Sequence, residues 1–499
     1  MKSISKIYHR KRRLFAIAAV FAFLGMALIL FFLYMSYYSR EKEKEADLQR
    51  IASEEYQGIF LSTYGVDSFS EGDFSTYRGL QIVKCSYEAK SLSDISEYLD
   101  AVFLTENKVT NIYLGLDSLT LWNACGKDIS GWDSALEEYL LPYFSSHPQV
   151  RFEILFSAPS LEHWGNASQE ELSQWTATCR SLVGIFDAYA NVSAYFPGSQ
   201  HWLIANPGNY ADNCALTFAA AKKLMLFTFC DGAFLITPDN SDVFFDELSV
   251  LIDAYQEAPK TYTDLSEWSV VFFGDSVMGN YEGSISVPGV TAGLSGAKVY
   301  NCATGGSTAS ASSAEIINFP KSVELFLAGD TSLLPEGSSF QTALASYLQE
   351  ESSGQKLCFV INYGLNDYFL GCEIDNAADP YDESTYCGAL RSGIRTLKDA
   401  HPEASILVAA PNFITIFSAG EEKNSEKGGV LTDYVDAAQR AANEMDAYSL
   451  NTYEALGYDA SNAADYLEDG CHLNEEGRFL FGEHIIRSIE DIISPAPQF

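Results

Sequence analysis

The stretch from Val270 to Ser276 limits most strongly what this chain can fold into. Four large apolar residues, Val270 to Phe273, lead directly into Gly274-Asp275-Ser276. A run of this kind is typical of a strand that is buried on both faces of a parallel sheet. The glycine lets the backbone turn sharply, so the serine stands at the carboxyl end of the strand. Because ligands bind at that end of open α/β sheets, Ser276 is a candidate site residue.

Strand-like and helix-like runs alternate over most of the 499 residues, which predicts an α/β protein. In a first domain, at 58–262, we expect strands at 79–84, 109–115 and 150–156 and helices at 92–104, 169–189 and 244–255. In a second domain, at 263–499, we expect strands at 269–273, 298–301, 356–362 and 405–410 and helices at 288–294, 385–400, 432–445 and 475–492. The polar, proline-bearing segment 258–266 marks the boundary. The repeated strand–helix order predicts a doubly wound, three-layer α/β/α fold for the second domain.

The N-terminus has the pattern of a membrane anchor. Residues 1–13 form a basic tail with six Lys and Arg and no acid, and the segment 14–39 contains no charged residue. Such a run can cross a bilayer as a transmembrane helix. The alternative, a cleaved signal peptide, would have a shorter apolar region before an Ala-x-Ala pattern, which is not present. Because basic flanks stay in the cytoplasm, we expect a charged, solvated stalk at 40–57 and both domains outside the cell membrane, as in a single-pass bacterial envelope protein.

The chain is strongly acidic, with a formal net charge of −36. Such a surface repels phosphate backbones, so we expect no nucleic acid among the partners, and solubility explains the acidity better. The ten cysteines include no Cys-x-x-Cys pair, so the sequence indicates no metal site and no cofactor. Cys372 and Cys387 bracket an acidic loop and are the first pair that we would test for a disulfide.

Four polar blocks follow strand-like runs in the second domain, and together they carry the chemistry. Ser276 is the candidate nucleophile, and the paired glycines before Ser307 let a backbone N–H approach an anion closely, as an oxyanion hole requires. Asn366 can aim a carboxamide N–H at the same point. Asp469 lies three residues before His472, so its carboxylate can hold the imidazole Nδ1–H while Nε2 faces the serine.

From about Trp268 to its end, the chain resembles the SGNH/GDSL hydrolases, a family named for a Ser, a Gly, an Asn and a His in four separate blocks. All four blocks occur here in the family's order. The resemblance implies a flavodoxin-like fold. It also implies that Ser276 is the nucleophile, that His472 is the base and that Asp469 orients the base. Ser276, Gly306 and Asn366 would then form the oxyanion hole.

Two features depart from the family's usual pattern. Val277 and Met278 follow the serine where Leu or Ile is usual, which affects packing, and a preceding α/β domain is uncommon. No Gly-x-Ser-x-Gly motif is present, which argues against the nucleophile elbow of α/β-hydrolases. We interpret Asp275 and Asp367, which adjoin the proposed site residues, as local hydrogen-bond organisers.

The first domain shows no assembled site. Its histidines, His147, His163 and His201, have no acid at short spacing, which favours structural roles. The segment 206–214 has the pattern of a turn before a helix with Asp212 or Asn213 as its cap, and it resembles the Asp-x-x-His block at 469–472 without its histidine. We interpret the first domain as a degenerate SGNH-like unit that has lost its catalytic residues. An unrelated α/β spacer is the alternative.

Each block also has a simpler structural explanation: Ser276 could cap a helix, Asn366 could form an Asx turn and His472 could be a surface residue. Their coincidence at strand ends favours catalysis. We therefore expect an extracytoplasmic serine esterase that deacetylates a cell-envelope glycan or hydrolyses a small ester through an acyl-serine. The alternatives are an O-acyltransferase acting on wall polymers and a non-catalytic glycan-binding or scaffold protein. The sequence does not decide between water and a sugar hydroxyl as acyl acceptor.

Overall fold

The computed structural model describes residues 40–62, 70–86, 89, 91–116, 129–165, 167–211, 215–257, 261–311, 317–350 and 355–494. The predicted basic tail at 1–13 and transmembrane helix at 14–39 lie outside these residues, as does the expected helix cap at 212–213. Within the described ranges, no helix combines the length and the apolar character needed to cross a membrane. The anchor therefore stays a prediction.

The chain divides into two compact units. The first consists of Met1–Ser157, Ala177–Tyr195 and Phe229–Pro238, and the second of Ala158–Thr176, Phe196–Thr228 and Asp239–Phe499. Within the described residues, each unit contains one sheet. Parts of the chain before residue 263 thus belong to the second unit, and the predicted single boundary at 262/263 stays a prediction of domain organisation.

The sheet of the first unit has the strand order β2-β1-β3-β4-β5-β6 in the described residues. Its neighbouring strands pair in parallel, except that β6 is antiparallel to β5. The strands are β1 (Gly58–Ser62), β2 (Ile82–Lys84), β3 (Asn111–Leu116), β4 (Arg151–Phe156), β5 (Val192–Tyr195) and β6 (Leu235–Ile236).

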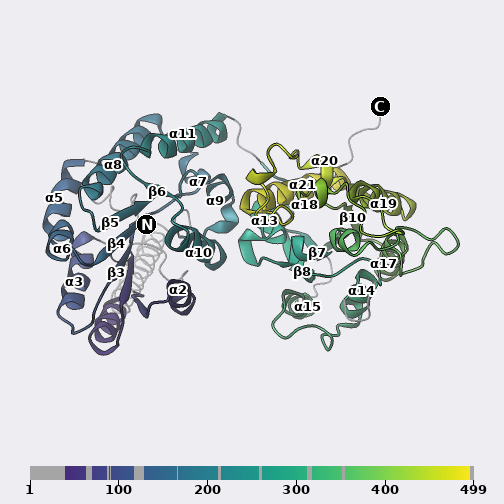
Figure 1. The fold of residues 1–499 in the computed structure, drawn as a ribbon, viewed down its shortest axis with the longest axis horizontal. Coiled ribbons are helices and arrows are strands. Elements are labelled where there is room, and N and C mark those ends of the chain that lie inside the picture. The colour runs from purple at the N-terminus through teal and green to yellow at the C-terminus, as the bar shows by residue number, and fades with distance from the viewer. Residues whose placement is uncertain are drawn as a thin grey trace, which may run out of the picture. The chain divides into compact units, whose positions relative to one another are not determined.

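The helices before residue 258 connect or follow these strands (Figure 1). They are α2 (Glu71–Arg78), α3 (Leu92–Phe103), α5 (Ile129–Tyr139), α6 (Leu141–Ser146), α7 (Leu161–Trp164), α8 (Gln169–Asp187), α9 (His201–Ile204), η2 (Pro207–Asn209), α10 (Phe218–Met225), η3 (Leu226–Cys230) and α11 (Ser241–Glu257). The expected helices at 92–104, 169–189 and 244–255 correspond to α3, α8 and α11.

The expected stalk at 40–57 is helical over residues 40–53, but it is not solvated on all sides. Asp47 and Ile51 are buried. Lys44 Nζ donates to Asp94 Oδ1 over 3.2 Å and to Glu97 Oε2 over 2.6 Å. The expectation of a solvated stalk was therefore wrong, because part of the charge pattern is used for ion pairs within the first unit.

The sheet of the second unit has the order β11-β10-β9-β7-β8, and all of its pairs are parallel. The strands are β7 (Trp268–Gly274), β8 (Lys298–Asn301), β9 (Lys356–Asn362), β10 (Ser405–Ala409) and β11 (Tyr448–Leu450). Counted along the chain, this is the flavodoxin-like order 2-1-3-4-5. The first five strands of the other sheet follow the same order. The two sheets therefore share a topology, while the loss of a catalytic site from the first unit stays a prediction.

Helices cover the second sheet in two groups. Helices α13 and α21 pack on each other, α14 packs on α17, and α17 packs on α19. Figure 1 shows α13 and α21 above β7 and β8 and α14 and α15 below these strands, as a three-layer fold requires. The helical elements are α12 (Ser276–Gly279), η4 (Gly283–Ile285), α13 (Val287–Ser295), α14 (Phe319–Ala328), α15 (Ser339–Gln349), α16 (Leu365–Leu370), α17 (Tyr386–Ala400), α18 (Ile416–Ala419), α19 (Leu431–Glu444), α20 (Thr452–Ala455), η5 (Ala463–Asp465) and α21 (Glu475–Ile493).

The strands and helices expected in the second domain all occur within a few residues of their predicted bounds. β11, α14, α15 and the short helices α12, α16, α18 and α20 were not predicted. β11 has only three residues and none of them is fully buried. It therefore lacks the apolar run by which a buried strand is recognised in the sequence. The suggested Cys372–Cys387 disulfide was wrong. No disulfide joins these residues, and Cys387 Sγ instead lies 3.2 Å from an Arg440 guanidinium nitrogen.

Gly274 ends β7, whose seven residues are all buried. A Cβ atom at this position would lie 2.8 Å from the Asn362 carbonyl oxygen and 3.0 Å from Met278 Cγ. The backbone does not need a left-handed φ here, because Gly274 is not among the positive-φ glycines. Glycine is therefore required for close packing against β9, and not for a sharp turn as the sequence suggested.

We expect Gly274→Ala to lower the free energy of unfolding by about 1–3 kcal/mol, because the added methyl group overpacks a buried strand end. The control is Gly184→Ala in α8. Nothing lies within 4 Å of a Cβ there, so helix propensity should raise stability by about 0.5–1 kcal/mol. Urea unfolding followed by tryptophan fluorescence measures both. A Gly274→Ala variant as stable as the parent protein would contradict the steric argument.

Candidate active site

Ser276 stands at the start of α12, directly after the central strand β7. Asp275 caps this short helix, and its Oδ1 accepts the Val277 N–H over 3.0 Å. The cap fixes the turn, so the serine lies at the carboxyl edge of the sheet, where the sequence predicted it. The side chain of Ser276 is only partly buried.

The loop after β8 lies beside this serine. The Thr304 N–H and the Ser307 hydroxyl both donate to the Gly274 carbonyl oxygen over 3.0 Å. A Cβ atom on Gly305 would lie 3.9 Å from Ser276 Cβ, so the paired glycines border the nucleophile. Gly306 has a φ of 78°, in the region that favours glycine, and is exposed.

Asn366 contacts the same loop. It lies in α16 after β9, and its Nδ2 donates to the Ser307 carbonyl oxygen over 2.8 Å. The neighbouring Asp367 is fully buried and accepts the backbone N–H groups of Ala309 and Ser310 over 2.8 and 2.9 Å. Asp367 therefore organises the loop by hydrogen bonds, as the sequence analysis expected.

His472 lies on the turn before α21 and reaches the serine. Its Nε2 is 2.9 Å from Ser276 Oγ, and its Nδ1 is 2.7 Å from Asp469 Oδ2. The other carboxylate oxygen of Asp469 accepts the backbone N–H groups of His472 and Cys471 over 2.7 and 2.9 Å. The structure thus brings together the serine, the histidine and the acid that the sequence selected.

The protonation states follow from this geometry. Burial alone would raise the pKa of Asp469, but the hydrogen bonds from the His472 ring and from two backbone N–H groups outweigh it and hold that pKa below its ordinary value. Asp469 is therefore an ionised, acceptor-only group, so Nδ1 of the neutral imidazole carries the proton. Nε2 is then an acceptor, and the Ser276 hydroxyl donates to it.

The two buried carboxyls beside the site behave differently. Burial raises the pKa of Asp275 to about 7, against the Val277 hydrogen bond and with a further contribution from the charge of Asp367. Burial likewise raises the pKa of Asp367 above its ordinary value. Near neutral pH these groups are poor general bases for a solvent-exposed ester, because neither is accessible to solvent.

Several supporting residues were missed by sequence reasoning. Asn301 Nδ2 donates to the Met278 carbonyl oxygen over 2.8 Å, which ties the second block to α12. His201 does have an acid partner, because its Nδ1 lies 2.7 Å from Glu476 Oε1. The two are 275 residues apart in sequence, so no local spacing could have indicated the pair.

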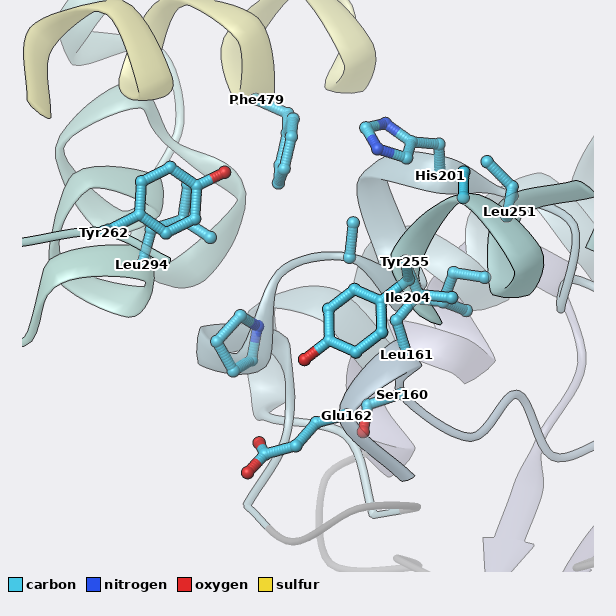
Figure 2. A pocket seen from close by; sticks show the side chains of 13 residues that line it. Ser160, Leu161, Glu162, His201, Ile204, Leu251, Tyr255, Tyr262, Leu294 and Phe479 are labelled. Carbon is cyan, nitrogen blue, oxygen red and sulfur yellow. The ribbon is translucent and has the colours of Figure 1, made fainter. Parts of the chain in front are cut away.

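A pocket of about 260 Å³ lies elsewhere in the second unit. Figure 2 shows the rings of Tyr255, Tyr262 and Phe479 around it, with His201 and Glu162 at its edge. None of the predicted site residues lines this pocket. The candidate chemistry is therefore at the sheet edge and not in this hollow.

The model of the GDSL-like Lipase/Acylhydrolase family matches residues 272–478. No curated protein is similar enough to the chain to count as a match. Among solved structures, the chain is similar to a carbohydrate acetylesterase from Sinorhizobium meliloti, at 16% identity and a TM-score of 0.30 over 45% of this chain and 99% of that one. It is also similar to a lipase/acylhydrolase from Enterococcus faecalis, at 16% identity and a TM-score of 0.30 over 46% and 99%. These values do not indicate what this chain acts on.

The raised pKa of Asp275 predicts a pH-dependent stability. An unfolded Asp titrates near 4, so between pH 5 and 7 the folded state holds a proton that the unfolded state has released, and this carboxyl's contribution to the free energy of unfolding falls by about 1.4 kcal/mol per pH unit as the pH rises. The carboxamide introduced by Asp275→Asn does not titrate. The stability of this variant relative to the parent protein should therefore rise over this window.

Urea unfolding at pH 5, 6 and 7 measures the difference between the two proteins. Asp399→Asn, at an exposed position in α17, is the control for the chemical change. A constant difference between Asp275→Asn and the parent across the three pH values would show that burial does not hold the Asp275 proton.

Proposed function

We propose that this protein is a serine esterase that acts through an acyl-serine formed on Ser276, which agrees with the match of residues 272–478 to the GDSL-like Lipase/Acylhydrolase family. The observation that carries the proposal is the hydrogen-bonded series from Asp469 through His472 to Ser276, with 2.7 and 2.9 Å separations. This arrangement activates a hydroxyl that is otherwise a weak nucleophile.

In the first half of the reaction, Ser276 Oγ attacks the ester carbonyl carbon and its proton passes to His472 Nε2. The imidazolium that forms is held by the ionised Asp469. Collapse of the tetrahedral intermediate breaks the bond to the alkoxide leaving group, which takes the proton from Nε2. The products are an alcohol and an acyl-serine.

The developing oxyanion needs hydrogen-bond donors around the substrate's carbonyl oxygen. The backbone N–H groups of Ser276 and Gly306 make no hydrogen bond to the described residues. One carboxamide N–H of Asn366 donates to the Ser307 carbonyl oxygen, and the second can donate to the oxyanion. We assign these three groups to the oxyanion hole.

In the second half, an acceptor hydroxyl loses its proton to His472 and attacks the acyl-serine. Water as acceptor completes ester hydrolysis. For the substrate we propose an O-acetylated cell-envelope glycan or a small ester. This choice rests on the predicted location outside the membrane, which the basic tail at 1–13 and the uncharged run at 14–39 support.

We expect a fluorophosphonate probe to label the purified protein at Ser276 and to fail with Ser276→Ala. Asn366→Ala should still be labelled, but its kcat on a short-chain aryl ester should fall on the order of 10²- to 10³-fold, because one oxyanion donor is lost. Ser332→Ala, at an exposed loop position, is the labelling control. Labelling and turnover that survive in Ser276→Ala would refute the assignment.

The same experiment addresses the alternatives. A folded protein without labelling or turnover would favour a glycan-binding or scaffold protein. A labelled protein that turns over only when a sugar alcohol is added would favour acyl transfer over hydrolysis.

The location has its own test. We expect a phosphatase reporter that folds only outside the cytoplasm to be active when fused after residue 57 and inactive when fused after residue 13. The intact mass of the membrane-extracted protein should include residues 1–39. An inactive reporter after residue 57 would place the enzyme on the other side, and a shortened mass would favour a cleaved signal peptide.

A further inference from the structure

We propose that the described residues of the segment 196–228 (196–211 and 215–228), which precedes the family-matching segment, complete the active site by holding the turn that carries His472, with Lys223 as the positioning residue. The inference rests on the proposed esterase function. It assigns a catalytic contribution to a part of the chain for which the sequence indicated only structural histidines.

One buried cation, Arg478, holds the turn that follows His472. The guanidinium of Arg478 is 1% exposed and donates to the carbonyl oxygen of Leu473, the residue next to His472. It also donates to the Ile285 carbonyl oxygen and to Glu475 Oε1, over 2.7 Å each. Because the guanidinium is planar and its donors are fixed in direction, these bonds set the path of the chain directly after the base.

Lys223 completes this arrangement from outside. It lies in α10, and its Nζ is 2.9 Å from the same Glu475 oxygen that Arg478 contacts. The side chains of Lys223 and Glu475 are 16% and 8% exposed. Loss of Lys223 leaves Glu475 paired with Arg478 but removes the ion pair that ties Glu475 to α10. Glu475, and through it Arg478 and the turn, would then be held less firmly.

A second side-chain contact joins the same segment to the same helix. His201 in α9 contacts Glu476, the next residue of α21, over 2.7 Å. Its ring also packs edge-on against Phe479 with centroids 4.9 Å apart, and Figure 2 shows the two side chains near each other. Lys223 and His201 thus contact adjacent residues in the first turn of α21.

Backbone packing keeps the segment in place. Asn206 is buried and its Nδ2 donates to the Ser284 carbonyl oxygen over 3.1 Å. A Cβ atom on Gly208 would lie 2.6 Å from Gly293 Cα, so the two backbones are in direct contact. Ser284 adjoins Ile285, which accepts from Arg478. The segment therefore contacts both supports of the His472 turn, the start of α21 and the η4 region.

The consequence for catalysis is geometric. Proton transfer depends on the 2.9 Å separation between Ser276 Oγ and His472 Nε2, and a displacement of about 1 Å can cost on the order of 10²-fold in rate. Lys223 has no assigned contact with the substrate. Its loss should therefore lower kcat and leave KM nearly unchanged.

The test compares Lys223→Met with the parent full-length protein on a short-chain aryl ester. We expect kcat and the rate of fluorophosphonate labelling to fall roughly 10-fold or more, with KM within about twofold. Lys223→Arg, which keeps the charge, should restore most of the activity. The matched control is Lys321→Met, which removes a lysine from an exposed ion pair with Glu324 in α14 of the same unit and should change neither constant.

Glu475→Gln is the second variant, because it keeps the shape of the side chain while removing its charge. If Lys223 acts through Glu475, the double variant Lys223→Met/Glu475→Gln should be no slower than the slower single variant. If Lys223→Met does not fold, Glu475→Gln alone carries the test, because its kcat should fall while its KM stays within about twofold.

Two results would overturn the inference alone: parent-like kcat in both single variants, or a rise in KM with unchanged kcat while the parent protein is active. A parent protein that neither hydrolyses esters nor reacts with the probe would overturn the proposed function and this inference with it.

Discussion

The carbonyl oxygen of Gly274 is the point on which the geometry of the site depends. It accepts hydrogen bonds from Thr304 and Ser307, so the glycine-bearing loop is fixed to the end of β7. In the same loop, the Ser307 carbonyl oxygen accepts a hydrogen bond from the Asn366 carboxamide, and backbone N–H groups donate to the carboxyl of Asp367. Because β7 is buried and paired on both edges, with β8 and β9, the nucleophile and the proposed oxyanion donors share the rigidity of the sheet.

Carboxyl groups serve two distinct purposes around this serine. Asp275 and Asp367 are buried, and their hydrogen bonds shape the helix cap and the loop. Burial raises the pKa of both carboxyls, because desolvation disfavours the charged form. Asp469 is half exposed and is stabilised as the anion by three hydrogen-bond donors. Asp469 is therefore the carboxylate that holds the His472 imidazole.

The base is held less directly than the nucleophile. Ser276 follows a strand, whereas His472 lies on a turn whose position depends on side chains. Arg478 fixes the turn from within α21, and Lys223 and His201 reach the first turn of that helix from residues 196–228. The second compact unit extends beyond the segment that matches the family, and Lys223 and His201 in the additional part contact the first turn of α21.

The sequence by itself determined the α/β class, most elements of the second sheet, and the candidate residues Ser276, Asn366 and His472. It could do so because apolar periodicity reports local structure, because Ser276 and Asn366 closely follow their strands, and because Asp469 lies at a recognisable spacing of three residues before His472. Only the tertiary structure decided that Gly274 must lack a side chain because the Asn362 carbonyl oxygen of β9 lies close to it. It also decided that residues 40–53 pack within the first unit and that Lys223 forms an ion pair with Glu475. Those contacts join residues far apart along the chain. A local sequence pattern does not indicate which distant residue will form the ion pair or which will limit the space for a side chain.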